Sequence, residues 1–150
     1  MPAKSAERRE TQKPELYSKD ILRLATSLPH GDALALPDAS ATRRSPICGS
    51  EISADVAMEN GQLTAIALRG RACAMGQASA AILRGSGVGR SMDNIADARA
   101  SLAQALIGEG SFDRCWPELG VFESARVYPA RHAAILLPFD AVLAAMTGSD

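Results

Sequence analysis

The spacing of apolar residues divides the start of the chain into a tail, a helix and a loop. Over residues 14–27 the apolar positions recur at intervals of three and four, which predicts one amphipathic helix. Pro29 ends this pattern, and residues 29–40 are rich in residues that break regular structure. Residues 1–13 are polar and charged without an apolar face, so we expect a disordered tail there. The remainder, 14–150, is expected to form a single domain.

In the next segment the period of the pattern drops to two. Apolar and polar residues alternate over 52–58 and again over 62–70. Asn60-Gly61 lies between them, and these two residue types readily adopt the positive φ angles of a tight turn. The pattern therefore predicts a β-hairpin with one buried face. Residues 41–46 are expected to add a third strand, at an edge of the sheet because Pro46 lacks a backbone donor.

Helical patterns dominate the second half of the chain. Small residues with high helix propensity fill 72–83, and Ser91 is a suitable N-cap for a helix that two glycines end. A short helical piece is expected at 117–125, and a last apolar helix carries Pro138. Strands followed by helices are typical of an α+β domain. We therefore predict a three-stranded antiparallel sheet with helices packed on one face.

Composition and charge narrow the classes of partner. The chain has 150 residues and a formal net charge of −1, so no strong field draws it to nucleic acid. We see no run of about 18 apolar residues that would cross a membrane. The charged N-terminus lacks the apolar stretch of a secretion signal. We therefore expect a cytoplasmic protein that binds neither nucleic acid nor membrane.

The three cysteines are candidates for metal, redox or packing roles, because a reducing compartment disfavours disulfides. Cys48 lies in the turn SPICGSEI before the hairpin, and Cys73 lies where the second hairpin strand meets the alanine-rich helix. A hairpin between them can bring both thiols to one edge of the sheet. The positive end of the helix dipole favours a thiolate at Cys73, the form that binds metal. Alternatively both are small core residues, the role that we also expect for Cys115.

Four segments, in this order along the chain, resemble the iron–sulfur cluster assembly scaffold proteins of the NifU, IscU and SufU type. The segments are LYSKDILRL (16–24), SPICGSEI (45–52), LRGRACAMGQASAA (68–81) and ARHAAILLPFDAV (130–142). The resemblance implies the α+β fold of these scaffolds. It also implies a site of three cysteines and one aspartate around an iron–sulfur cluster or a zinc ion, with a cysteine desulfurase as sulfur donor.

The site implied by the resemblance is incomplete, so the chain resembles a divergent member of the family. Cys48 and Cys73 match two of the family cysteines, whereas Ser50 stands in place of the aspartate and Ala134 in place of the third cysteine. His132 lies two positions before Ala134, and imidazole is a good ligand for zinc or iron. The candidate ligands are therefore Cys48, Cys73 and His132, with Ser50 near the site.

Two neighbours of His132 are candidates for a supporting role. Arg131 could hold an anionic cluster by its charge, or it could pair with a surface carboxylate. Asp140 lies about two turns further along the same helix and could orient a ligand or be surface charge. His132 itself could instead be a solvent-exposed residue at the start of a helix.

These residues fit three functions. In the first, the protein is a non-enzymatic scaffold or carrier that binds an iron–sulfur cluster transiently, or zinc, and passes the cluster to recipient apo-proteins; two copies could bridge one cluster as a homodimer. In the second, Cys48 accepts persulfide sulfur from a cysteine desulfurase, a role implied by the resemblance to SufE-like and SufU-like proteins. In the third, a degenerate relative keeps the fold as an interaction module.

Overall fold

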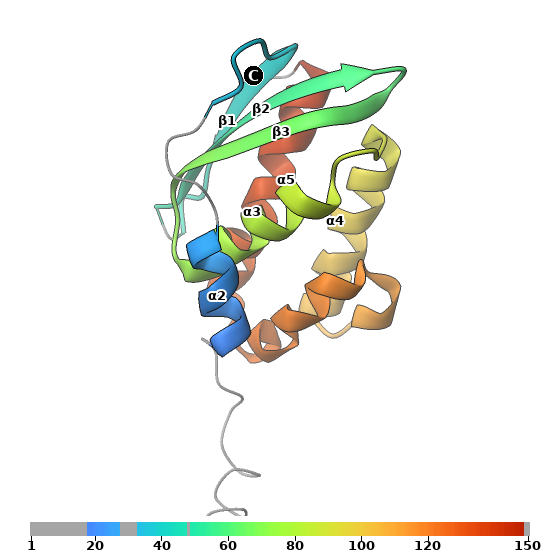
Figure 1. Cartoon of the computed structure of the whole chain (residues 1–150). Coiled ribbons are helices and arrows are strands. Elements are labelled where there is room, and N and C mark those ends of the chain that lie inside the picture. The colour runs from blue at the N-terminus through green and yellow to red at the C-terminus, as the bar shows by residue number, and fades with distance from the viewer. Residues whose placement is uncertain (1–17, 28–32, 48, 149–150) are drawn as a thin grey trace, which may run out of the picture.

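The computed structural model describes residues 18–27, 33–47 and 49–148, and Figure 1 shows how these segments are arranged. The predicted tail over 1–13 and the candidate ligand Cys48 lie outside them. The elements follow in the order α2 (Lys19–Ser27), β1 (Ala39–Arg44), β2 (Glu51–Glu59), β3 (Gln62–Arg71), α3 (Ala74–Ser86), α4 (Met92–Leu106), the 3₁₀ segments η1 (Phe112–Arg114), η2 (Pro117–Val127) and η3 (Pro129–Arg131), and α5 (His132–Thr147).

The sheet has the order β1-β2-β3, and both pairs of neighbours are antiparallel, as the alternating pattern predicts. The turn of the hairpin lies at Asn60 and Gly61, whose φ angles of 55° and 79° are those of a tight turn. The third strand is at an edge, as predicted, but it covers 39–44 and not 41–46. It ends early because the Ser45 carbonyl accepts a hydrogen bond from Gly49 N–H at 2.9 Å, which closes a turn.

Helices α3 and α5 lie against one face of the sheet, which confirms the predicted α+β architecture (Figure 1). The core between them is made of fully buried apolar side chains from the strands and from both helices. Its largest members include Ile52, Leu63, Met75, Leu83, Ile135 and Phe139. Burying each such side chain contributes about 1.5–3 kcal/mol, so this contact holds the helices on the sheet.

The outer helices follow the sequence closely. The Ser91 hydroxyl accepts a hydrogen bond from Asn94 N–H, and the Asn94 side chain accepts one from Ser91 N–H, so α4 begins with a reciprocal cap. The predicted helical piece over 117–125 is the 3₁₀ segment η2, which is two residues longer. The predicted helix over 72–83 is α3, which starts at Ala74 and continues to Ser86.

Helix α5 is apolar on almost every side because it passes through the centre of the core. The segment Pro129–Thr147 has the length and composition of a membrane-crossing helix, yet 50% of it is buried inside the protein. Burial in the core therefore accounts for its apolar character. Pro138 lies inside this helix and cannot donate a backbone hydrogen bond. In the turn of α5 before Pro138, the Ile135 carbonyl accepts a hydrogen bond from the buried Ser79 hydroxyl of α3. This bond holds the two helices together.

The opposite face of the sheet carries a buried ion pair. Asp55 of β2 is 3% exposed, and its carboxylate accepts hydrogen bonds from Arg69 at 2.7 Å, from the Ser40 hydroxyl at 2.6 Å and from Leu34 N–H at 3.1 Å. Burial acts to raise the pKa of Asp55, but these hydrogen bonds and the Arg69 charge outweigh it and hold the pKa below its usual value. The network ties the segment before β1 to all three strands.

Candidate functional site

Cys73 stands at the junction of β3 and α3, where the sequence places it. It is the N-cap residue of α3, with an extended backbone (φ −68°, ψ 172°), and its side chain makes no capping hydrogen bond. The thiol is free and half-buried. The first turn of α3 contains no acidic residue. The partial positive charge of the N–H groups at the start of this helix is therefore not neutralised by a carboxylate of the same turn. The junction therefore suits a sulfur ligand or an anion bound beside Cys73.

The start of β2 lies beside this junction. The sheet pairs Glu51 with Arg71, so the same register continued by one residue puts Ser50 opposite Ala72. Ser50 is 5% exposed, and its carbonyl accepts a hydrogen bond from Ser45 N–H at 2.8 Å. Cys48 is two residues earlier and outside the described residues, so its position beside Cys73 stays a prediction.

The small residues around Cys73 serve packing and backbone contact. A Cβ atom at Gly70 would overlap the carbonyl oxygen of Glu51, and its φ of 139° also favours glycine. A Cβ atom at Gly76 would come within 2.9 Å of the Ala72 Cβ and 3.3 Å of the Ala134 carbonyl oxygen. Glycine is therefore required at both positions because protein atoms already fill the space that a side chain would need.

Ala134, which stands in place of the third family cysteine, lies against α3. It is fully buried, and its carbonyl oxygen is the atom that approaches Gly76 in the first turn of α3. The start of α5 is therefore packed beside the helix that Cys73 caps. The methyl group of Ala134 fills this contact and offers no ligand atom.

His132 is the first residue of α5, and one of its ring nitrogens is already bound within the protein. The Nε2 atom lies 2.8 Å from the Ala125 carbonyl oxygen. A carbonyl only accepts hydrogen bonds, so Nε2 carries the proton and the neutral ring keeps its lone pair on Nδ1. Metal-binding histidines commonly have this arrangement, with the second nitrogen donating to a carbonyl. His132 can therefore offer Nδ1 alone.

The two candidate supporting residues have different surroundings. Arg131 is half-buried at the N-cap of α5, directly before His132, and makes no ion pair with a carboxylate among the residues that the structure describes. Asp140 pairs with Arg99 of α4 at 2.6 Å. This ion pair accounts for Asp140 as a contact between two helices, so the structure gives it a packing partner other than His132.

Cys115 is a core residue, as expected. It is 9% exposed, and burial raises the pKa of its thiol. The neighbouring Trp116 packs against Phe139 with ring centres 5.8 Å apart, and the Arg90 guanidinium lies 4.5 Å from the Trp116 ring centre. Cys115 therefore lies in an apolar environment with little access to solvent, which makes it poorly suited to bind metal.

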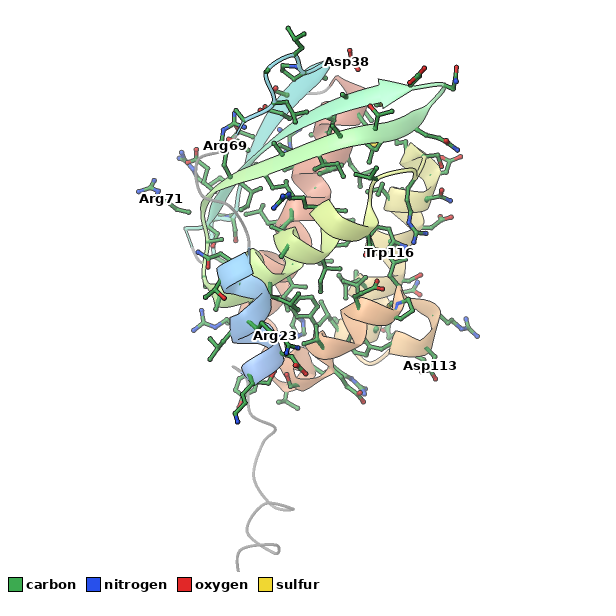
Figure 2. All side chains as sticks on the ribbon, viewed as in Figure 1. Arg23, Asp38, Arg69, Arg71, Asp113 and Trp116 are labelled. Atoms are coloured by element: carbon green, nitrogen blue, oxygen red, sulfur yellow. The ribbon has the colours of Figure 1, made fainter. Side chains whose placement is uncertain are left out.

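Two residues near the junction were not singled out by the sequence. Ser45 is 3% exposed, and its hydroxyl has no hydrogen-bond partner among the described residues. Arg71, two residues before Cys73, is exposed and points away from the body of the protein (Figure 2). The alternation of strand residues could have predicted that Arg71 is exposed. No sequence pattern predicts that the Ser45 hydroxyl is buried without a hydrogen-bond partner.

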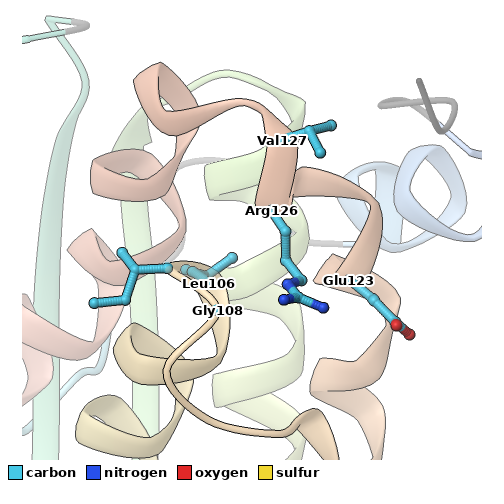
Figure 3. A pocket seen from close by; sticks show the side chains of 6 residues that line it. Leu106, Gly108, Glu123, Arg126 and Val127 are labelled. Atoms are coloured by element: carbon cyan, nitrogen blue, oxygen red, sulfur yellow. The ribbon is translucent and has the colours of Figure 1, made fainter. Parts of the chain in front are cut away.

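The described residues do not form a complete metal site by themselves. Within 18–27, 33–47 and 49–148, no three His, Cys, Asp or Glu side chains gather closely enough to hold a metal ion. Any three-ligand site at the junction would therefore need Cys48. A pocket of about 310 Å³ between the end of α4 and η2 is lined by Leu106, Glu123, Arg126 and neighbours, and neither Cys73 nor His132 reaches it (Figure 3).

Comparison with known proteins gives a consistent result. No protein-family model and no curated protein sequence matches the chain. Among solved structures, a nitrogen-fixing NifU-like protein (N-terminal) from Brucella abortus is 34% identical, with a TM-score of 0.81 over 89% of this chain and 94% of the other. A protein assigned as an iron–sulfur cluster assembly scaffold for the SUF system, from Fervidobacterium islandicum AW-1, is 17% identical. It matches with a TM-score of 0.75 over 87% of this chain and 96% of the other, which shows a shared fold.

Proposed function

Because the chain belongs to the NifU-like family of iron–sulfur cluster assembly scaffolds, we propose that it binds a cluster transiently at Cys48, Cys73 and His132. The cluster is cargo that the protein passes on, and the protein carries out no catalysis of its own. The observation that carries the proposal is the free, half-buried Cys73 at the N-cap of α3, beside the start of β2.

The chemistry of these ligands suits a carrier. Thiolates bind iron and zinc well, and imidazole is a weaker ligand for iron. Two thiolates with one imidazole leave a coordination position open, through which a recipient can take the cluster. The contact between His132 Nε2–H and the Ala125 carbonyl supports this role, because it leaves Nδ1 for a ligand. Arg131 would add positive charge beside an anionic cluster.

The proposed partners follow from the same chemistry. Sulfide must come from a sulfur donor, for which we propose a cysteine desulfurase, and the cluster must leave to recipient apo-proteins in the cytoplasm. Zinc can occupy the same ligands when no cluster is present. Two copies of the chain would supply four thiolates to one shared cluster, from Cys48 and Cys73 of each copy. We therefore propose that the loaded form is a homodimer.

One observation favours a second function. Ala134 replaces the third cysteine, so a single chain has at most two thiols at the junction. Accepting sulfur needs only one: the Cys48 thiolate attacks the outer sulfur of the desulfurase persulfide, and the desulfurase thiolate leaves. Under this alternative Cys48 carries a persulfide and Cys73 is a bystander.

Anaerobic reconstitution with iron and sulfide tests the first function. We expect a visible charge-transfer band that is lost in both Cys48→Ala and Cys73→Ala and kept in the matched control Cys115→Ala. Ala134→Cys, which restores the third family cysteine, should lengthen the lifetime of the band. If Cys73→Ala keeps the full band, the scaffold proposal is wrong. A persulfide found by mass spectrometry on Cys48 alone would instead support the acceptor.

A further inference from the structure

The pocket between the end of α4 and η2 has an apolar wall and a charged wall. Its volume of about 310 Å³ is at the lower end of the range for small-molecule sites. The apolar wall is made of Leu106, Ile107 and Val127. Leu106 is 1% exposed, whereas Ile107 and Val127 are 61% and 42% exposed, so water reaches two of these side chains. Covering them with an apolar group of a ligand is therefore favourable.

The charged wall comes from one side of η2. Glu123 and Arg126 follow one another after a full turn of this 3₁₀ segment, so they lie on the same side of it. Neither side chain forms an ion pair or a hydrogen bond within the part of the chain that the structure describes. The pocket therefore contains a carboxylate and a guanidinium that are paired neither with each other nor with another described group.

The end of α4 explains the position of Arg126. Gly108 has a φ of 82°, and a Cβ atom there would come within 3.1 Å of Arg126 Nη2, so glycine lets the guanidinium approach the helix end (Figure 3). Carbonyl groups at a helix C-terminus carry partial negative charge, which attracts a cation. The carbonyls of Ala103 and Ala105 accept hydrogen bonds from the turn that follows α4. Within the described residues the Leu106 carbonyl accepts none, so it remains an acceptor for a ligand.

We propose that this pocket binds a free α-amino acid with a branched apolar side chain. The ligand carboxylate pairs with Arg126, its ammonium group pairs with Glu123, and its side chain packs against Ile107 and Val127. A zwitterion is favoured because it satisfies both unpaired charges, whereas a simple anion or cation would leave one of them alone. The pocket is open to water, where charge pairs contribute little, so we expect a dissociation constant on the order of 1 mM.

The amino-acid site does not rest on the proposed cluster function, because Cys73 and His132 do not line the pocket. Failure to assemble a cluster in reconstitution would leave amino-acid binding intact. Failure to bind an amino acid would equally leave the cluster proposal intact, since the two experiments use different ligands and different residues.

A nuclear magnetic resonance titration of the full-length protein with leucine tests the proposal. We expect shifts at the Gly108 amide and at the methyl groups of Ile107 and Val127. Three analogues each lack one group of leucine: isopentylamine lacks the carboxylate, isocaproate lacks the ammonium group, and glycine lacks the apolar side chain. Each analogue should bind about tenfold more weakly than leucine, because each loses one of the proposed contacts.

Two variants assign the charged contacts. Arg126→Gln should weaken leucine binding about tenfold and leave the affinity for isopentylamine unchanged, because that analogue has no carboxylate. Glu123→Gln should weaken leucine binding by a similar factor and leave the affinity for isocaproate unchanged. The matched control is Arg84→Gln, which removes an exposed arginine outside the pocket and should leave leucine binding unchanged.

Several outcomes would overturn the amino-acid site. One is the absence of shifts at a leucine concentration about ten times the expected dissociation constant. Another is an analogue that binds as tightly as leucine, or equal weakening of leucine and isopentylamine in Arg126→Gln. Shifts of the pocket residues that depend on protein concentration without leucine would also overturn it, because a second copy of the chain would then cover the pocket.

Discussion

Cys73 and Cys115 are the same residue type in opposite surroundings. Cys73 caps a helix at the end of the sheet, is half-buried and has small neighbours. Cys115 lies beside a tryptophan in the core, is 9% exposed, and has a thiol pKa raised by burial. The comparison teaches that the position of a cysteine relative to a helix end and to solvent, and not its presence, distinguishes a proposed ligand from a packing residue.

The largest expected difference between the two regions is in thiol reactivity. In a Cys48→Ser background at pH 8, iodoacetamide should modify Cys73 at least about 100-fold faster than Cys115, because only an accessible thiolate reacts. Peptide mass spectrometry over time measures both rates. In urea the two rates should become similar, and equal rates in the folded protein would contradict the assigned environments.

Removing the imidazole of His132 should weaken zinc binding, by a smaller factor than the difference in thiol reactivity. His132→Ala should lower zinc affinity about 10–100-fold, since one of the three proposed ligands is lost. Competition with a chromogenic chelator measures this change. Arg126→Ala, on a surface away from the junction, is the matched control and should leave zinc affinity unchanged. Unchanged affinity in His132→Ala would assign the histidine to packing against Ala125.

The ion pair between Asp55 and Arg69 should affect stability but not metal binding. Asp55→Asn should lower the free energy of unfolding at pH 7 by about 2 kcal/mol, because it removes the charge paired with the partly exposed Arg69. The folded pKa of Asp55 is lowered, so its contribution is present above the unfolded value of about 3.9 and is lost as pH falls below it. Urea unfolding at pH 7 and at pH 3 measures both effects. A variant as stable as the wild type at pH 7 would contradict this role.

Cys115 should contribute less to the free energy of unfolding than Asp55 does. Cys115→Ala should cost about 1–1.5 kcal/mol of stability, because it leaves a small cavity beside Trp116. Zinc stoichiometry should stay unchanged. For Cys73→Ala the pattern should be reversed, with a smaller loss of stability and loss of metal. Unfolding curves and metal analysis on the same two variants test the comparison, and a loss of zinc in Cys115→Ala would reverse it.

The fold was largely predictable because its signals are local. The alternation around Asn60-Gly61 specifies the hairpin, and the Ser91 cap specifies where α4 begins. The bounds of β1 were misplaced by two residues because a loop hydrogen bond at Ser45 ends the strand, and no periodicity encodes such a bond. The 3₁₀ geometry of η2 was also missed, since it differs from an α-helix by packing rather than by residue pattern.

The site was predictable only in part. Cys73 at a helix N-cap follows from the pattern, because the strand ends and the alanine-rich helix begins there. The bond from His132 to the Ala125 carbonyl and the pairing of Asp140 with Arg99 depend on how helices pack. The need for glycine at positions 70 and 76 could not be predicted, because their neighbours are backbone and methyl groups brought close only by the tertiary fold.

X-ray absorption spectroscopy of the zinc-loaded protein tests the central claim most directly. The account predicts two sulfur ligands at about 2.3 Å and one imidazole nitrogen at about 2.0 Å, with one sulfur lost in Cys73→Ala and the imidazole lost in His132→Ala. A shell made of oxygen and nitrogen alone, or a shell that Cys73→Ala leaves unchanged, would contradict it.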